Sequence, residues 1–158
     1  RMDKLEYIPG DLVMTNGVPC GTAKDVVYRV TLSDPSRTLK LDDGTELKGV
    51  VRLENLEGSE FGDKGYLLGE CCAWVKDIVP IPLTPTILEK NGWKIPYDEG
   101  FYCSPNKKGI SVFLPSRFIG TVRNAYTAHI HLLRSNINSV SDLQHLLFGL
   151  GINHEMEV

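Results

Sequence analysis

The sequence lacks acidic side chains over one long stretch, because no Asp or Glu occurs from Gly100 through Ser141. The whole chain has 17 Lys and Arg against 20 Asp and Glu, with a formal charge of −3. Positive charge that no acidic residue of the same stretch offsets is therefore concentrated here. A local positive field attracts anions such as phosphate. Its basic residues are Lys107, Lys108, Arg117, Arg123 and Arg134.

Other absences exclude whole classes of protein. No apolar run approaches the roughly 20 residues of a membrane-spanning helix, and residues 1–10 lack the apolar core of a signal peptide. The negative net charge argues against a partner made of double-stranded nucleic acid. The four cysteines show no CxxC spacing, so we expect reduced thiols in a cytoplasmic protein and no structural zinc. We expect no membrane partner.

Catalytic motifs are also missing. The chain has no G-x-S-x-G elbow, Walker loop, HExxH or GxGxxG sequence. We therefore expect a protein without catalytic residues, resident metal or cofactor.

The pattern of residues predicts a mostly β protein of the α+β class with two lobes. Residues 1–83 alternate β-branched and polar side chains between tight turns, which favours a small SH3-like barrel. The Asp-Asp-Gly-Thr run at 42–45 is a hairpin signal. The expected strands cover residues 12–14, 26–32, 39–41, 47–53 and 71–81.

Residues 84–158 are expected to form a second β-rich lobe with two helices. Thr84 followed by Pro85 predicts the start of a short central helix over 85–91, which Gly92 ends. Ser139 is expected to cap a C-terminal helix over about 140–150 with an apolar stripe of leucines. The expected strands cover residues 93–95, 101–104, 109–114, 117–122 and 125–133.

Two kinds of side chain in the second lobe suit an anion. His129 and His131 would share one face of a strand about 7 Å apart, and a third metal ligand is missing nearby, which favours an anion over a metal. Arginine offers a planar fork for phosphate. Aromatic side chains in the same region could stack on a base. The predicted ligand-binding residues are Arg117, Arg123, Arg134, His129, His131, Trp93, Tyr126, Lys107 and Lys108.

One segment resembles a known group of proteins. Residues 75–93 read VKDIVPIPLTPTILEKNGW, and residues 141–152 read SDLQHLLFGLGI. These motifs are similar to those of small uncharacterised proteins from Bacteroidetes, their prophages and mobile elements. Members carry a "PIPLTPEILEKNGF" segment and a C-terminal helix with a Leu-Gln pair. Thr86 and Trp93 depart from the usual Glu and Phe. The resemblance implies a bacterial or phage setting, inside a bacterial host cell.

Three functions are open at this point. The leading hypothesis is a non-enzymatic phage or mobile-element protein that acts as a sponge for a small phosphorylated ligand, a nucleotide immune signal, and so counters host defence. The second is a protein-interaction module whose basic face docks and inhibits a host protein. The third is a phosphodiesterase that uses His129 and His131 as bases. A homo-oligomer with the apolar C-terminal helix at its interface is expected.

Overall fold

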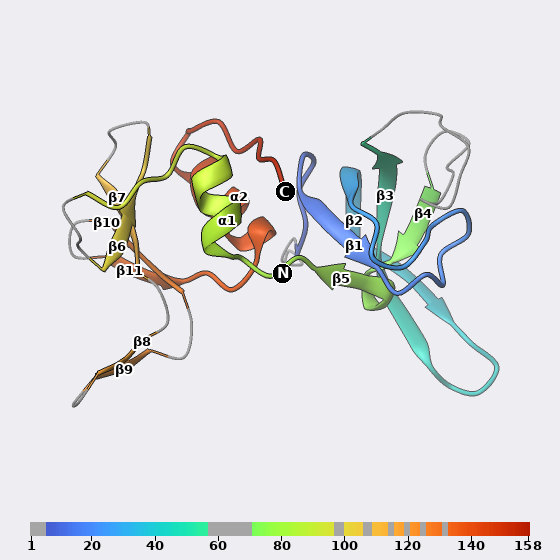
Figure 1. Cartoon of the computed structure of the whole chain (residues 1–158). Coiled ribbons are helices and arrows are strands. Elements are labelled where there is room, and N and C mark those ends of the chain that lie inside the picture. Colours follow the sequence, from blue (N-terminus) through green and yellow to red (C-terminus); the bar gives the residue numbers. More distant parts are fainter. Residues whose placement is uncertain are drawn as a thin grey trace.

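The computed structural model describes residues 6–56, 71–96, 100–105, 109–113, 116–118, 121–123, 126–130 and 133–158. For 116–118, 121–123 and 133–135 it describes the backbone. Within these residues the protein is mostly β, with two antiparallel sheets, a two-stranded ribbon and a C-terminal helix (Figure 1). The predicted β-rich class is therefore confirmed.

The first sheet is open and antiparallel. Its order is β4-β3-β2-β1-β5, so β4 and β5 form its two edges. No sheet closes within the described residues, and the expected SH3-like barrel is not confirmed. The strands are β1 (Leu12–Thr15), β2 (Tyr28–Lys40), β3 (Glu46–Asn55), β4 (Cys71–Trp74) and β5 (Ile78–Pro80).

The prediction of one continuous strand over 71–81 is wrong. A 3-10 turn, η1 (Val75–Asp77), separates β4 from β5. Asp77 anchors this turn, because its buried carboxylate accepts hydrogen bonds from the Asn16 side chain (2.8 Å) and from Lys76 (3.0 Å). Before the turn, β4 pairs with β3 at one edge of the sheet. After the turn, β5 pairs with β1 at the opposite edge.

The second lobe contains both helices and a four-stranded sheet of order β11-β10-β7-β6. The helices are α1 (Pro85–Lys90) and α2 (Val140–Gly149). Both predicted caps are confirmed: the Thr84 side chain accepts a hydrogen bond from the Ile87 amide, and Ser139 forms a capping box with Asp142. The strands are β6 (Phe101–Cys103), β7 (Ile110–Phe113), β10 (Thr127–Ile130) and β11 (Leu133–Asn136).

Two strands expected to be continuous are hairpins. The range 117–122 contains parts of β8 (Ser116–Phe118) and β9 (Thr121–Arg123), which pair with each other. The range 125–133 contains β10 and the start of β11, and Ile130 pairs with Leu133 in antiparallel register. His129 lies on β10, and the predicted partner on its strand, His131, is outside the described residues.

The helices cover one face of the second sheet. Tyr102, Val112 and Ala128 are at most 3% exposed on that face and share a core cluster with residues of α1 and α2. The Tyr102 hydroxyl also donates to a Glu89 carboxylate oxygen of α1 (2.8 Å). Figure 1 shows both helices between this sheet and the first lobe, so the sheet forms the far end of the molecule.

The lobes meet where α2 contacts residues 7–12. Gln144 is fully buried, its side-chain oxygen accepts from the Leu12 amide (2.8 Å), and its side-chain nitrogen donates to the carbonyls of Gly10 and His154 (2.9 Å each). Leu12 belongs to the core cluster of the second lobe, although it is part of β1. A second cluster lies within the first lobe around Tyr28, Val30, Val51 and Leu53.

Candidate functional site

The face of the second sheet that points away from the helices carries aromatic and polar side chains. Successive residues of a strand point to opposite sides. Because Tyr102, Val112 and Ala128 face the helices, their neighbours in sequence face the other way. We call this the outer face; its described side chains are Phe101, Cys103, Ser111, Phe113, Thr127 and His129, all of intermediate exposure.

Strand register aligns one row of residues across the whole sheet. Ser111 of β7 pairs with Cys103 of β6 on one side and with His129 of β10 on the other. The row ends in basic residues, because an isolated bridge joins Cys103 to Lys94, and Arg134 of β11 is the backbone partner of His129. The order is therefore Lys94, Cys103, Ser111, His129, Arg134. No carboxylate in the described part of the chain forms an ion pair with Lys94.

The neighbouring row is aromatic. Phe101 of β6 pairs with Phe113 of β7, and their ring centroids lie 4.9 Å apart with a tilt of 32°. The Phe113 ring also contacts His129, at 4.3 Å between centroids and a tilt of 38°. Rings whose centroids are this close cannot lie side by side in one plane, so the three rings partly stack on one another next to the row that ends in basic residues. We call these three side chains the aromatic stack.

A cavity lies at the β6 end of the polar row. Its volume is about 370 Å³, which is within the range of small-molecule sites. Both Lys94 and Cys103 contribute to its wall, so the hollow continues the row beyond the sheet edge. Its lining residues are Gly92, Lys94, Ile95, Pro96, Cys103, Ser104 and Pro105.

The predicted arginines fall on two different parts of the second lobe. Arg117 and Arg123 belong to the β8–β9 ribbon, in which Arg117 pairs with Val122 and Arg123 pairs with Ser116. Figure 1 shows this ribbon projecting away from the four-stranded sheet that holds Arg134. The backbone therefore brings Arg134 beside His129 and keeps Arg117 and Arg123 on a separate element.

The remaining predicted residues have different positions. Trp93 is 3% exposed in the core, so its ring has no free face on which a base could stack. Tyr126 is partly buried against the same core, and this burial raises the pKa of its hydroxyl. His131, Lys107 and Lys108 lie outside the described residues. Sequence reasoning missed Phe113 and Ser111, although the alternation of Ile-Ser-Val-Phe over 110–113 places both on one face.

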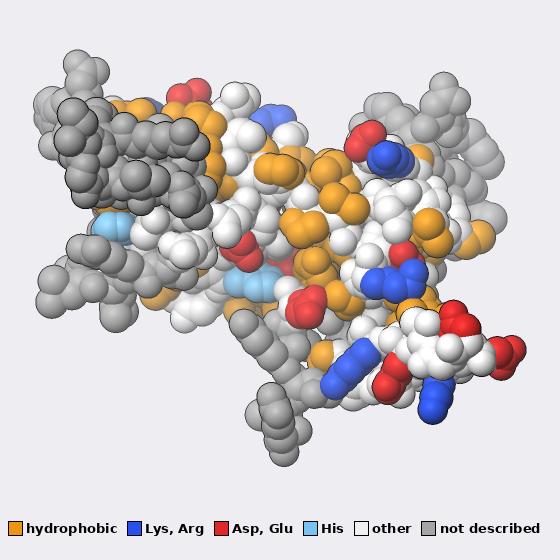
Figure 2. Space-filling view, turned by 90° about the horizontal axis from the view of Figure 1, so that it is seen from below, with side chains coloured by type: hydrophobic (Ala, Val, Ile, Leu, Met, Phe, Trp, Pro, Cys, Tyr) orange, Lys and Arg blue, Asp and Glu red, His pale blue; other side chains and the backbone are white. Residues whose placement is uncertain are grey.

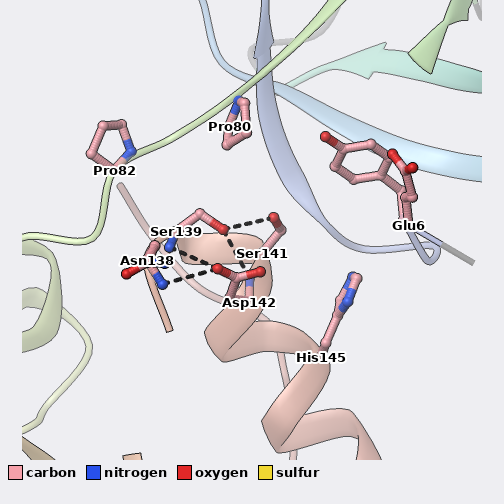
Figure 3. Close-up of a pocket in the computed structure, with 9 residues that line it drawn as sticks. Glu6, Pro80, Pro82, Asn138, Ser139, Ser141, Asp142 and His145 are labelled. Atoms are coloured by element: carbon pink, nitrogen blue, oxygen red, sulfur yellow. Dashed lines mark hydrogen bonds between the residues drawn. The ribbon is translucent and has the colours of Figure 1, made fainter. Parts of the chain in front are cut away.

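A second cavity, of about 510 Å³, opens between the two lobes. Figure 3 shows Pro80 and Pro82 on one side, Glu6 on another, and Asn138, Ser139, Ser141, Asp142 and His145 around the start of α2. Seen from below, acidic and histidine side chains gather in the middle of the molecule, where the lobes meet (Figure 2). Burial and the charges of Glu6, Asp11 and Asp142 raise the pKa of the Tyr7 hydroxyl in this wall to about 12.

The chemistry of this cavity differs from that of the outer face. The His145 Nε2 atom forms a hydrogen bond with Oδ2 of the fully buried Asp11 carboxylate at 2.5 Å. The other carboxylate oxygen, Oδ1, has no hydrogen-bond partner among the described residues. The Ser141 hydroxyl is engaged with the Ser139 hydroxyl (3.1 Å). The acidic lining repels an anion, so this cavity is unsuited to a phosphorylated ligand.

Searches for related proteins give no further lead, since no known family, curated protein or solved structure matches this chain. Among the described residues, no group of three or more His, Cys, Asp or Glu side chains is placed to hold a metal ion. No helix in the same part of the chain is long and apolar enough to cross a membrane. The functional argument therefore rests on the geometry of the site.

Proposed function

We propose that this protein is a non-enzymatic binding protein that sequesters a small phosphorylated ligand on the outer face of its second lobe. In the phage or mobile-element setting that the sequence resemblance implies, the ligand would be a nucleotide immune signal of the host cytoplasm. One observation carries the proposal: strand register aligns Ser111 and His129 between two basic residues, Lys94 and Arg134, next to the aromatic stack.

This arrangement offers the groups that phosphate recognition needs. The Ser111 hydroxyl and the His129 imidazole supply hydrogen-bond donors, and protonation of the imidazole adds positive charge. Arginine supplies a bidentate fork, while lysine acts as a point charge. The strands that form the face belong to the stretch without Asp or Glu, so that stretch adds no negative side chain to the face.

The test begins with protein purified from cells, denatured, and analysed by mass spectrometry for released small molecules. We expect a stoichiometric phosphorylated ligand from the wild type and none from Arg134→Glu, with the two proteins melting at similar temperatures. Arg37→Glu is the matched control, because it makes the same charge change at an exposed position of β2. Equal loading of both variants, or a wild-type protein without ligand, would contradict the proposal.

A second candidate function, docking to an acidic host protein, is supported by the β8–β9 ribbon. This ribbon projects from the lobe and carries Arg117 and Arg123 on adjacent strands (Figure 1). Replacing both arginines with glutamate would then abolish binding to the partner and leave ligand loading unchanged. Loss of ligand in this double variant would favour the first function instead.

Two structural proposals accompany the function. The first lobe is proposed to be SH3-like, because its strands follow the order β4-β3-β2-β1-β5 with a 3-10 turn between β4 and β5. A homo-oligomer is proposed at the C-terminal end of α2, where Phe148 is 57% exposed and the following Leu150 is 42% exposed. Sedimentation at several concentrations tests the oligomer, and Phe148→Glu should shift it toward monomer.

A further inference from the structure

We infer that the cavity between the two lobes is a second binding site, which takes a primary ammonium group on an aliphatic stem. This site is separate from the outer face and goes beyond the proposed function. Its described lining contains two carboxylates, Glu6 and Asp142, and one imidazole, His145, but no Lys or Arg. Its volume of about 510 Å³ lies within the range of small-molecule sites.

A buried carboxylate stands behind the wall of this cavity. Asp11 is fully buried, and its Oδ2 atom accepts hydrogen bonds from the Ile8 amide (3.0 Å) and from Nε2 of His145. Its Oδ1 atom has no partner among the described residues. Burying a carboxylate is costly unless opposite charge or hydrogen bonds compensate it. The described residues compensate Asp11 only in part, so a cation in the adjacent cavity would be stabilised.

The bond to Asp11 determines what the His145 ring offers to a ligand. An ionised carboxylate only accepts hydrogen bonds, so Nε2 of His145 carries the proton of this bond. In the neutral ring, Nδ1 is then an acceptor. The His145 side chain is 30% exposed and lines the cavity, and Figure 3 shows its ring projecting from α2 toward the side on which Glu6 lies. The ring therefore suits a ligand that donates an N–H.

The two carboxylates of the wall are also available to a ligand. Oδ2 of Asp142 accepts from the amides of Asn138 (2.9 Å) and Ser139 (3.1 Å), and Oδ1 takes part in neither bond. Glu6 and Asp142 are both exposed. Neither forms an ion pair with a Lys or Arg of the described chain. Both can therefore accept from a cation without breaking an internal contact.

The arrangement of the acceptors favours an ammonium over a guanidinium. Glu6 precedes β1, whereas Asp142 and His145 lie on α2, so the acceptors approach from different directions (Figure 3). An ammonium has three donors that point apart, while a guanidinium is a planar fork that matches a single carboxylate. Pro80 and Pro82 form an apolar part of the wall, along which an aliphatic stem can lie. A free diamine and a lysine side chain both have this chemistry.

The experiment is a titration of the full chain with three probes, followed in ¹H–¹⁵N correlation spectra. The probes are cadaverine, N-acetyl-lysine amide, and N-acetyl-norleucine amide, which has an aliphatic stem without an ammonium. We expect saturable shifts at the amides of Ser141, Asp142 and His145 with at least one of the two amines, and none with the norleucine derivative. Tighter binding of cadaverine would identify a free diamine as the source of the ammonium, and tighter binding of the lysine derivative would identify a protein side chain.

Two variants test the carboxylates. Asp142→Asn keeps an oxygen that can cap α2 but removes the charge, and it should weaken amine binding by about 5- to 10-fold. Glu6→Gln should weaken it by a similar factor. Asp43→Asn is the matched control, because it makes the same change at an exposed carboxylate that accepts from the Thr45 amide (2.8 Å) in the turn between β2 and β3.

Three results would overturn the inference: no saturable shifts with either amine, equal binding of the norleucine derivative, or wild-type affinity in both Asp142→Asn and Glu6→Gln. None of these results bears on the outer face, whose residues are different. Failure of the ammonium site is therefore distinguishable from failure of the proposed function.

Discussion

Gln144→Leu is the substitution that most directly tests how the two lobes are joined. The new side chain has nearly the same volume, so it leaves little cavity, but it removes three hydrogen bonds at a fully buried position. The Leu12 amide and the carbonyls of Gly10 and His154 all lose their bond to this side chain. A buried polar group without a partner costs about 1–3 kcal/mol.

The magnitude follows from these three groups. If one or two of them find water at the lobe boundary, one or two remain without a partner, and the free energy of unfolding falls by about 1–6 kcal/mol. The upper part of this range is a large fraction of the 5–15 kcal/mol that is typical of a domain. Urea denaturation at 25 °C, followed by fluorescence, measures the loss as a lower midpoint.

Asn136→Leu provides the control for this measurement. It is the same kind of amide-to-leucine change at an exposed position of β11, and it should alter stability by no more than about 0.5 kcal/mol. A loss of less than about 1 kcal/mol in Gln144→Leu would refute the reasoning. It would mean that the Gln144 bonds do not hold the lobes together.

Two further predictions concern backbone strain and pH. Gly10 has φ +95°, and an added Cβ would lie 2.8 Å from the His154 ring, whereas Gly44 has φ +88° with nothing within 4 Å. Gly10→Ala should therefore lower the free energy of unfolding by about 2–3 kcal/mol, and Gly44→Ala by about 1–2 kcal/mol. Equal losses for the two variants in urea denaturation would argue against the contact with His154. Burial and the hydrogen bond to Glu89 raise the pKa of Tyr102 from 10.0 to about 12. The protonated Tyr102 hydroxyl therefore stabilises the fold fully below pH 10, and this contribution is lost as the pH rises toward 12. The difference in free energy of unfolding between wild type and Tyr102→Phe should become smaller between pH 10 and 12. A constant difference would contradict this prediction.

Local signals predicted the elements that depend on a few neighbouring residues. Thr84 with Pro85 and Ser139 with Asp142 define helix starts by hydrogen bonds within four residues, and both helices begin there. The turn after Leu41 was equally readable, because Gly44 supplies the positive φ that a tight hairpin requires. Such features need no knowledge of the rest of the fold.

Tertiary pairing decided what the sequence could not show. The break at 75–77 depends on Asp77 meeting Asn16, which is 61 residues away along the chain. The antiparallel pairing of β10 with β11 divides the range 125–133, for which the sequence predicted a single strand. The excess of positive charge over 100–141 was visible from the start, but register decides which of its residues become neighbours, and it places Arg134 rather than Arg117 beside His129.

The most direct test of a ligand site on the outer face is residue-level mapping in solution. A ¹H–¹⁵N correlation spectrum of the full chain would be recorded during titration with a phosphorylated probe, the linear diadenylate pApA. The account predicts saturable shifts at the amides of Cys103, Ser111 and His129, with the first-lobe strands unchanged. Shifts confined to the cavity between the lobes, around Ser139 and His145, would contradict it.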